Sequence, residues 1–586
     1  MLSSKIYNSE ELDEATRNLV IDLQNQGYLG AKISGVRTEF DEKKEKVIIR
    51  VNLDEGPQTA VQNIAFKGAS HISPEDLEAT IGLQPNTPLN LSVLEQSSAR
   101  IVQLYQSRGY LDAQVTNAGK SIISYSQDNT KATLEYHVSE GPQIVVDNIL
   151  IEGNDFTKDY VIRRELQFKP GDILNVDKIS YSEQRLQRLS FFSNIDIHTI
   201  NDDPQEGRRT VVVTVREQNP GVFKSGIGVN NDFGTTVKGF AGVDYRNLFG
   251  TGRGVNFRGE LAEKTQYNFL EDTITIGYTE PYIIGTKNTA HLILLKSRKL
   301  LESLSNGQTW ATDTDQGDLT LERDLSPQLK LIYDFYGIAH MNFFEINNYY
   351  VIPGPPVSVT APTLVDIATL GPTLILDRRN DPFNPTFGDI SSLGLEFSHP
   401  YMGSSSTVSY YKVTAGYTRY IPINKMTWAN QFKAGFLQNI SAASDGAVPF
   451  PKIFNIGGPS TIRGFDPYTE SVPLLSELPV SSPYYGLPTY SWFNLVKSEF
   501  RFPIIGNLGG ALFYDGGQVV FPEYHPTFRW RDAVGVGLHY NTPVGPVSLE
   551  YAFKLEVDQN RGGNVSENVS PIQESTGQFI FNIGVF

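Results

Sequence analysis

The chain has 586 residues, which is long enough for several domains rather than a single hydrophobic core. It contains no cysteine, so disulfide bonds, thiolate nucleophiles and cysteine metal sites are excluded, and a net charge of −16 without a basic patch argues against nucleic-acid binding. Aromatic residues make up 11% of the chain, and no run approaches the roughly 18 apolar residues of a membrane helix, so any part that meets lipid must do so as a β-barrel.

Two segments near the N-terminus repeat one sequence pattern. QNIAFKGASHISPEDLEATI at 62–81 is similar to DNILIEGNDFTKDYVIRREL at 147–166, with Gly68 and Gly153 at equivalent positions. In both segments apolar residues alternate before the glycine, which is typical of a strand that ends in a turn. The sequence therefore predicts a repeating α/β unit with a period of about eighty residues.

A second pattern follows in each unit and predicts a helix. In its earliest copy, Leu12, Ala15, Leu19 and Leu23 recur at spacings of three and four, which places them on one helical face, and Gly27 then ends the helix. Each copy closes on an alternating segment: VIIRVNLDEGP, ATLEYHVSEGP or TVVVTVREQNP. The predicted unit is strand, helix, helix, strand, strand. One asparagine falls at the same position in each copy: Asn8, Asn90 and Asn175.

We predict three such units, at residues 1–57, 58–142 and 143–220, and a different domain at 221–586. The first unit lacks the opening strand and helix of the pattern, so we expect the natural protein to extend further upstream. The N-terminal sequence MLSSKIYNSEELDE has none of the features of a signal peptide. An alternative is a string of small α/β modules with no special role.

The last domain alternates in segments of about ten residues that are separated by turn residues. In 236–261, Val237 and Val243 fall on one face of such a segment, and Lys238 and Asp244 fall on the other. One apolar face and one polar face are typical of a barrel wall between lipid and water. The alternative is a large soluble β-sandwich or propeller, but the sequence shows no repeat of blade length.

The chain ends on GQFIFNIGVF, an alternating apolar strand that would leave an adhesive edge in water. Closure of a barrel removes this edge by pairing the last strand with the first one, near residues 221–231. The length from 221 to 586 allows about 16 antiparallel strands. The predicted fold is therefore a set of α+β repeats followed by an all-β transmembrane barrel.

Seven segments of the last domain follow the order of the sequence signatures of a known family. They are GTTVKGFAGVDYRNLFGTG (234–252), LDRRNDPFNPTFG (376–388), GGPSTIRGF (457–465), NLVKSEFRFPI (494–504), ALFYDGG (511–517), GVGLHYNTPVGPVSLEYA (535–552) and the terminal FIFNIG. With the repeats, which resemble POTRA domains, they resemble the BamA/TamA family of outer-membrane assembly barrels over essentially the whole chain. The resemblance implies POTRA repeats in the periplasm and a barrel in the bacterial outer membrane.

The resemblance also implies a role for the GGPSTIRGF segment. In the family, a loop with the (V/I)RGF signature folds back into the barrel lumen, where its arginine meets acidic side chains. The expected acidic partners are Asp515 and, as a second, Glu499. A buried guanidinium needs such partners because burying it unpaired is costly. An ordinary surface loop with a solvated arginine is the alternative. The residues that match the loop signature are Ile462, Arg463, Gly464 and Phe465.

The other matched residues are predicted to be scaffold. Asp377, Arg378, Asp381, Pro382, Pro385 and Gly388 read as a strand end and turn, and Pro543, Gly545 and Pro546 read as a connection between strands. The glycines of GTGRG at 250–254 lie in a hairpin, so they are not a dinucleotide-binding loop. The eight histidines are scattered singly. We therefore predict no enzymatic activity, no cofactor and no metal site.

The predicted function is the folding and insertion of β-barrel proteins in the outer membrane. The resemblance implies that the repeats receive clients by strand addition and that the junction of the first and last strands opens as a lateral gate. The expected partners are unfolded outer-membrane β-barrel proteins, membrane lipids, and periplasmic chaperones or accessory lipoproteins. The predicted seam residues are Phe223, Ser225, Ile227, Val229, Phe579, Phe581, Ile583 and Phe586.

The pairing at the seam and the function both keep an alternative. Family members commonly have an extra residue or more between NIG and the final aromatic residue, whereas only Val585 intervenes here, so the pairing at the seam stays open. A two-partner-type secretion pore that exports one specific protein through the lumen is the alternative function. A passive porin is disfavoured by the expected luminal loop and by the repeats.

Overall fold

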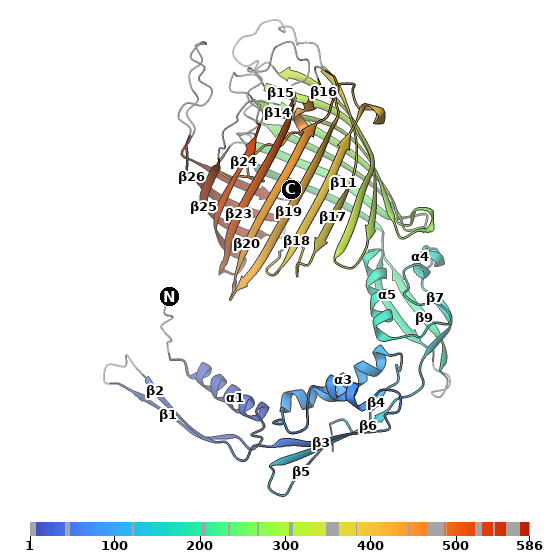
Figure 1. The fold of residues 1–586 in the computed structure, drawn as a ribbon, viewed down its shortest axis with the longest axis vertical. Coiled ribbons are helices and arrows are strands. Elements are labelled where there is room, and N and C mark those ends of the chain that lie inside the picture. The colour runs from blue at the N-terminus through green and yellow to red at the C-terminus, as the bar shows by residue number, and fades with distance from the viewer. Residues whose placement is uncertain are drawn as a thin grey trace. The chain divides into compact units, whose positions relative to one another are not determined.

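The computed structural model describes residues 7–41, 47–119, 122–200, 207–231, 235–265, 269–303, 309–346, 363–382, 384–443, 446–465, 486–487, 489–521, 530–542, 545–557 and 575–584. The chain forms two compact units, Met1–Gln218 and Asn219–Phe586. The first contains helices and small sheets, and the second is a large barrel (Figure 1). Among the described helices, none is both long and apolar enough to cross a bilayer.

The first unit repeats one α/β pattern. The earliest copy consists of α1 (Ser9–Asn25), β1 (Lys32–Phe40) and β2 (Val47–Asp54). The next consists of β3 (Ala60–Lys67), α2 (Pro74–Ile81), α3 (Leu91–Ser107), β4 (Gln114–Val115), β5 (Ile123–Tyr125) and β6 (Lys131–Ser139). The last consists of β7 (Val145–Glu152), α4 (Asp159–Arg163), α5 (Val176–Arg188), β8 (Phe192–Thr199) and β9 (Arg208–Glu217). The last copy has the predicted order of strand, helix, helix, strand, strand.

The first and last strands of a full repeat pair in parallel, β3 with β6 and β7 with β9. The apolar faces of the helices cover one side of each sheet. In the second repeat, Leu77 and Ile81 of α2 and Ile101 of α3 are fully buried with residues of β6. Burial of such apolar side chains supplies the main stabilising free energy of the second and third repeats, each of which has its own core cluster.

The equivalent asparagines of the three repeats begin the long helices. Each side chain accepts a hydrogen bond from a backbone N–H group in the first helical turn, which is the geometry of an N-cap. The pairs of cap and donor are Asn8 with Glu10, Asn90 with Val93 and Asn175 with Lys178. The repeated asparagine therefore has a local structural cause.

The second repeat departs from the predicted order, because two short strands, β4 and β5, take the place of one. Both pair with β6 in the antiparallel sense. Between them, the Asn117 side chain donates to the carbonyl of Glu135 at 2.8 Å and accepts from the N–H of His137 at 2.9 Å. An asparagine side chain can replace backbone hydrogen bonds in this way, so the chain leaves the sheet at a turn and returns to it.

A glutamate at the end of the last strand fastens the turn that follows the first strand. Glu140 accepts hydrogen bonds from the backbone N–H groups of Ser70 and His71 at 2.7 and 2.9 Å. Burial opposes ionisation of Glu140, but these hydrogen bonds and that of the Ser70 hydroxyl lower its pKa to about 2. Glu217 accepts from two backbone N–H groups of the corresponding turn at 2.9 and 2.6 Å. The acidic ending of the second and third repeats is therefore structural.

The second unit contains sixteen antiparallel barrel strands in the described part of the chain, as the sequence predicts. Each strand pairs with the next one along the chain, β20 pairs with β23, and β27 pairs with β10. The strands are β10 (Gly221–Asn230), β11 (Thr236–Leu248), β12 (Arg253–Lys264), β13 (Phe269–Glu280), β14 (Thr289–Ser303), β15 (Thr309–Asp324), β16 (Leu329–Ile346), β17 (Thr363–Asp377), β18 (Gly388–Ser398), β19 (Tyr410–Ile423), β20 (Met426–Asn439), β23 (Tyr490–Ile505), β24 (Leu508–Val520), β25 (Arg531–Thr542), β26 (Gly545–Lys554) and β27 (Gly577–Gly584).

The elements between these strands are short. A pair of two-residue strands, β21 (Val448–Pro449) and β22 (Gly486–Leu487), lies between β20 and β23 in the sequence. Three 3₁₀ turns in the described residues are η1 (Ile283–Gly285), η2 (Pro400–Met402) and η3 (Phe450–Lys452).

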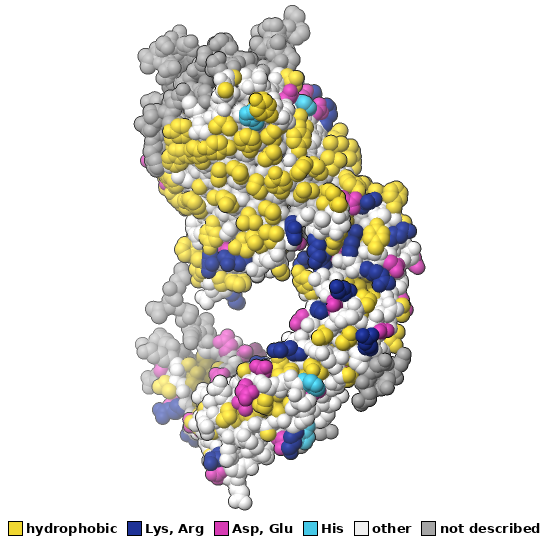
Figure 2. Space-filling view, turned by 45° about the vertical axis from the view of Figure 1, so that its right-hand side comes forward, with side chains coloured by type: hydrophobic (Ala, Val, Ile, Leu, Met, Phe, Trp, Pro, Cys, Tyr) yellow, Lys and Arg dark blue, Asp and Glu magenta, His cyan; other side chains and the backbone are white. Residues whose placement is uncertain are grey.

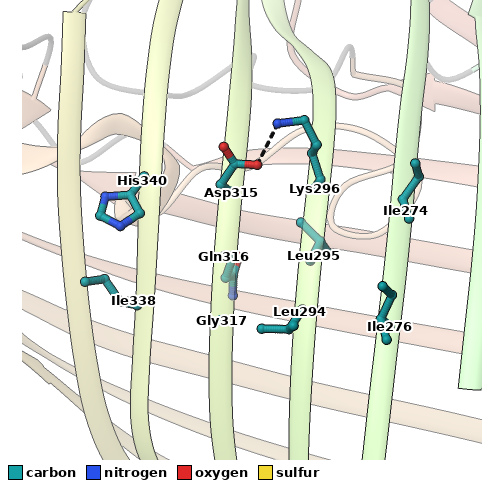
Figure 3. Close-up of a pocket in the computed structure, with 10 residues that line it drawn as sticks. All are labelled: Ile274, Ile276, Leu294, Leu295, Lys296, Asp315, Gln316, Gly317, Ile338 and His340. Atoms are coloured by element: carbon teal, nitrogen blue, oxygen red, sulfur yellow. Dashed lines mark hydrogen bonds and ion pairs between the residues drawn. The ribbon is translucent and has the colours of Figure 1, made fainter. Parts of the chain in front are cut away.

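The outer face of the barrel is apolar in its middle. On β14–β16 it becomes polar only two residues further along each strand. Figure 2 shows hydrophobic side chains gathered in a broad band over the barrel. On β14–β16, Leu294 and Ile338 flank Gly317 in one row of paired positions, and a polar row follows (Figure 3). A shallow hollow of about 350 Å³ lies over the two rows. This change from apolar to polar suits a boundary between lipid and water. This second row consists of the ion pair of Lys296 with Asp315 and the polar ring of His340.

Candidate functional site

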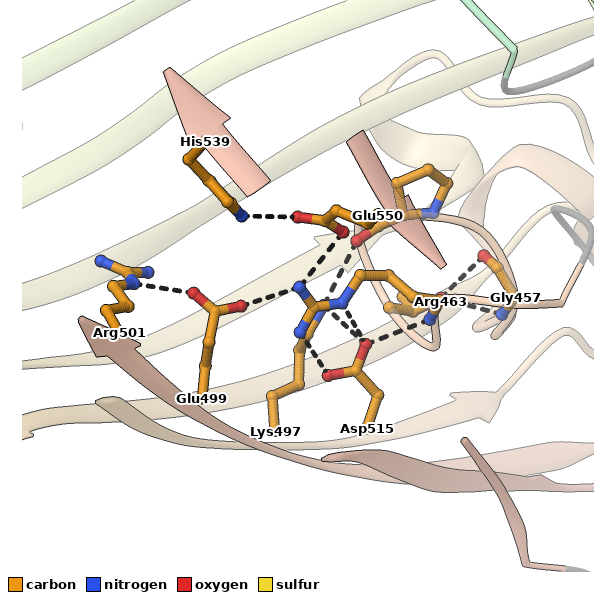
Figure 4. Close-up of polar contacts among 10 residues, drawn as sticks. Gly457, Arg463, Lys497, Glu499, Arg501, Asp515, His539 and Glu550 are labelled. Atoms are coloured by element: carbon orange, nitrogen blue, oxygen red, sulfur yellow. Dashed lines mark hydrogen bonds and ion pairs between the residues drawn. The ribbon is translucent and has the colours of Figure 1, made fainter. Parts of the chain in front are cut away.

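Residues 446–465, which follow β20 in the sequence, fold into the barrel, and we call them the luminal loop. Ile462, Arg463 and Phe465 of this loop are 1%, 6% and 2% exposed. Ile462 and Phe465 pack in one apolar cluster with Leu495 of β23 and Ala533 of β25. Figure 4 shows the loop arginine pointing at charged side chains that project from the neighbouring strands. The loop signature therefore lies inside the barrel rather than on its surface.

The guanidinium of Arg463 meets three carboxylates. Its Nε and Nη2 atoms donate to the two oxygens of Asp515 at 2.7 and 2.9 Å, which is a bidentate pair. Its Nη1 atom donates to Glu499 at 2.7 Å and to Glu550 at 3.3 Å. The guanidinium carbon also lies 3.5 Å from the centre of the Phe513 ring, within the range of a cation–π interaction. The arginine is thus held by β23, β24 and β26 together.

Two more cations balance these carboxylates. Lys497 Nζ lies 3.5 Å from the nearer oxygen of Asp515, and Arg501 Nε lies 2.7 Å from the second oxygen of Glu499. With the loop arginine they give three positive charges against three negative ones. A buried cluster of this kind is stable only while its charges are paired, so the removal of one member leaves an uncompensated charge.

Glycine and small residues let the loop approach the wall. Gly464 has a φ of +92°, and a Cβ atom there would lie 2.9 Å from the Cβ of Ala552 on β26. A larger side chain would therefore strain the backbone and collide with the wall. Next to it, the Phe465 ring lies 4.7 Å from the guanidinium carbon of Arg531 and 4.9 Å from Nζ of Lys554. The glycine and the phenylalanine of the signature each have a defined packing role.

The structure brings together the three charged residues that the sequence singled out, Arg463, Asp515 and Glu499. The sequence prediction missed Glu550 and Lys497. A usable signal was present, because a strand places alternate residues on opposite faces. In VSLEYA, Leu549 is half-exposed on the outer face, so Glu550 has to face inward. Charged residues at inward positions of these strands were candidates for the same cluster.

The predicted turn after β17 is held by ion pairs. Arg378 Nη2 lies 2.7 Å from Asp389 Oδ2, and Asp381 accepts from the N–H of Asn384 at 3.2 Å. Gly388 has a φ of +101°, and a Cβ there would lie 2.2 Å from the carbonyl oxygen of Arg378. These contacts support a scaffold role. In the later connection, Pro543 lies outside the described residues, and Pro546 pairs with Asn541 in the hairpin of β25 and β26.

The seam between the first and last strands contains few paired residues. In the described part of the chain, β10 pairs with β27 at three positions: Gly228 with Gly584, Val229 with Ile583 and Asn230 with Asn582. On its other edge β10 pairs with β11 along its whole length. Among the described residues, 221–227 have no strand on their seam side.

The predicted seam residues divide into three groups. Val229 and Ile583 pair with each other across the seam. Phe223, Ser225 and Ile227 lie on the part of β10 for which the described residues offer no second partner strand. The remaining members are on or beyond the last strand. Phe579 and Phe581 pair with Tyr551 and Leu549 of β26, and Phe586 lies outside the described residues.

One side chain extends the short seam. Asn231 follows directly after β10, and its Nδ2 atom donates to the carbonyl of Phe579 at 2.5 Å. Its Oδ1 atom accepts from the N–H of Phe581 at 2.9 Å. A side-chain amide can thus stand in for a backbone peptide group, and here it adds two hydrogen bonds to the three paired positions.

The described residues contain no group of three or more histidine, aspartate or glutamate side chains arranged to hold a metal ion. The acidic residues of the luminal cluster face arginine and lysine side chains instead.

Comparison with known proteins adds the following findings. Residues 247–586 match the family model described as "Omp85 superfamily domain". Residues 3–56, 59–141 and 144–218 match the POTRA model described as "Surface antigen variable number repeat". The barrel model alone covers more than half of the chain.

Several relatives are similar over nearly the whole chain. The outer membrane protein assembly factor BamA of Nitratidesulfovibrio vulgaris is 23% identical, over 99% of this chain and 68% of that protein. The BamA of Neisseria meningitidis serogroup B is 21% identical, over 94% of this chain and 72% of that protein. Among solved structures, BamA from Haemophilus ducreyi lacking POTRA domains 1–3 is 18% identical with a TM-score of 0.65, covering 90% of this chain and 99% of that one. This structural likeness shows a shared fold.

Proposed function

The chain belongs to the Omp85 superfamily, and on this premise we propose that it folds and inserts β-barrel proteins in the bacterial outer membrane. The POTRA repeats lie in the periplasm and the barrel spans the outer membrane. The relatives named above carry the name outer membrane protein assembly factor, which supports this proposal. The chain performs this work by binding and templating rather than by a chemical reaction.

The observation that carries the proposal is the weakly closed edge of β10. Gly221–Ile227 offer backbone N–H and C=O groups on the seam side, and no strand pairs with them among the described residues. A free strand edge binds another strand through main-chain hydrogen bonds, without requiring a particular sequence. An incoming client strand therefore adds to β10 and displaces the three pairs to β27. The predicted seam residues act as this lateral gate.

The repeats provide further edges for client capture. In the third repeat the sheet order is β7, β9, β8, so β7 and β8 are both edge strands. In the second repeat β3 pairs with β6 along one side. Residues 86–89 cover the start of its other side through a bridge of Ala60 with Pro88, and no strand pairs with the rest of that side, 63–67, among the described residues. Unfolded barrel proteins add strands at such edges before they reach the membrane. Periplasmic chaperones and accessory lipoproteins are the expected additional partners.

The luminal loop has a supporting role in this proposal. Ile462–Phe465, held by Asp515 and Glu499, keeps the strands next to the gate in place while β10 separates from β27. This assignment is supported by the burial of the arginine and by its contacts to three strands.

The experiment that tests the function is depletion of the protein in its native host. We expect a broad loss of unrelated β-barrel proteins from the outer membrane, measured by quantitative proteomics of that membrane. Loss of one exported protein with normal barrel levels would instead indicate a secretion pore. A change in small-solute uptake alone would indicate a porin, and either result would refute the proposal.

A further inference from the structure

The luminal loop is fixed to the barrel at a second place, eleven residues before its arginine in the sequence and on different strands. Lys452 ends the 3₁₀ turn η3, and its Nζ atom lies 3.0 Å from Oε2 of Glu396 on β18. The second oxygen of Glu396 accepts from the hydroxyl of Tyr410 on β19 at 2.7 Å. Glu396 is thus oriented by one strand neighbour and paired with the loop.

A second lysine binds the backbone of the same turn. Lys412 of β19 donates from Nζ to the carbonyl oxygen of Lys452 at 2.8 Å. The same Nζ atom lies 4.6 Å from the centre of the Phe454 ring. The loop therefore receives a hydrogen bond and a cation–π contact in addition to its ion pair.

Apolar packing surrounds these polar contacts. Val448, Ile453 and Phe454 of the loop are buried in one cluster with side chains of β17, β19 and β20. The Phe454 ring lies 4.5 Å from the ring of Phe493 on β23. A Cβ atom at Gly435 on β20 would lie 2.5 Å from the Phe454 ring, so this glycine makes room for it. The turn therefore packs closely against the inner face of the barrel.

The two attachments hold different parts of the barrel. The arginine end contacts β23, β24 and β26, whereas the lysine end contacts β18 and β19. Since neighbours in the barrel run β18, β19, β20, β23, β24, β25 and β26, the loop connects strands six positions apart. The seam strands β10 and β27 lie outside this connected stretch.

We propose that Glu396, Tyr410 and Lys412 form a second anchor, which binds Lys452 and so positions the luminal loop for the ion pairs of Arg463. The loop is then a brace from β18 to β26 that is fixed at both ends. A loop held at one end only retains freedom at the other, so loss of the second anchor loosens the segment that leads to Arg463. The consequence for client assembly rests on the proposed function, but the positioning itself does not.

The test uses the absence of native cysteine. A single cysteine at the exposed Ser460 in the full chain carries a nitroxide label, and its mobility is measured by electron paramagnetic resonance. We expect Lys452→Met and Glu396→Gln each to raise the mobile share of the spectrum several-fold. Lys452→Arg keeps the positive charge that Lys452→Met removes. We therefore expect the label in Lys452→Arg to be as immobile as in the unaltered protein, whereas a purely steric role of Lys452 would not require its charge. Lys425→Met, in the exposed turn between β19 and β20, is the matched control and should leave the spectrum unchanged.

The outcomes separate the anchor from the function. If both Lys452→Met and Glu396→Gln leave the label as immobile as in the unaltered loop, the second anchor does not position Arg463 and the proposal fails. If Lys452→Met does not fold, Glu396→Gln decides alone, because it preserves the size of the side chain. Client assembly is measured separately on the unaltered protein. If that protein assembles no clients but the label becomes mobile in the two variants, the proposed function is refuted and the second anchor is supported.

Discussion

The wall that carries the luminal loop and the seam differ in how firmly they are held. β24 and β25 pair from Leu508–Tyr540 to Gly517–Arg531, and their inner faces bind the loop through a buried ion cluster and apolar contacts. At the seam, β10 and β27 pair at three described positions and gain two hydrogen bonds from Asn231. The barrel is therefore stabilised unevenly around its circumference.

This difference supports the proposal that the barrel opens at the seam. Separating two fully paired strands breaks a long ladder of hydrogen bonds, and along the wall it also breaks buried ion pairs. Separating β10 from β27 breaks far fewer interactions. Under strain we expect the seam to separate first, while the loop keeps the strands from β18 to β26 in register. We call the strands from β18 to β26, which the luminal loop connects, the frame. One closed sheet thus contains this frame and the weakly paired junction of β10 with β27.

The largest expected effect comes from breaking the frame. Arg463→Ala leaves Asp515, Glu499 and Glu550 with two cations instead of three, inside the barrel. We expect the free energy of unfolding to fall by about 3–5 kcal/mol, as for other buried pairs that lose one partner. Urea titration of the purified barrel, followed by its heat-modifiable migration in gels, measures this.

Arg463→Lys is the matched comparison for that change. Lysine retains the charge but not the bidentate geometry, so we expect an intermediate loss of stability. An unchanged urea midpoint for Arg463→Ala would show that the cluster does not hold the frame.

A smaller effect is expected from the close approach of the loop to β26. Gly464→Ala forces a residue with a Cβ into a positive φ, which costs about 1–2 kcal/mol, and presses that Cβ against Ala552. Urea titration should show a midpoint between those of the parent and Arg463→Ala. Gly506→Ala is the control, since it also has a positive φ but no atom lies within 4 Å of its added Cβ. Equal losses at both sites would show that the loop does not press on β26.

The smallest loss of stability is expected from a change at the seam. The same change should raise the population in which the seam is open. Asn231→Ala removes two hydrogen bonds to the last strand, so we expect a loss of about 1 kcal/mol. A fluorophore and quencher pair placed across the seam should report a higher open population. Lower opening in this variant would contradict the view that Asn231 helps to close the junction.

Much of this organisation is predictable from local sequence, and the rest depends on long-range register. Helix caps such as Asn90, the repeated units and the number of barrel strands follow from spacing and alternation. The pair of Arg463 with Asp515 followed from a family signature. Alternation along β26 indicates that Glu550 faces inward. Its contact with Arg463, like that of Lys452 with Glu396, depends on where the luminal loop meets the wall, and no local pattern in the chain encodes that position.

The division of one strand in the second repeat was also missed. It depends on the Asn117 side chain, which replaces two ladder hydrogen bonds of β6. Asparagine in such a position reads equally well as an ordinary loop residue, so composition alone could not decide it. The register of the seam could not be predicted from local sequence either. It is set by where β27 meets β10 and not by either strand alone.

The central claim is that β10 separates from β27 during assembly, and a disulfide across the seam tests it most directly. Cysteines at Asn230 and Asn582 occupy paired positions, and a pair at Leu512 and Val536 locks β24 to β25 as a control. In liposomes containing the purified protein, we predict that oxidation of the seam pair reduces client folding to the rate of empty liposomes and that a reductant restores it. The control pair should have no effect. Client folding at the normal rate with the seam fully oxidised would contradict the account.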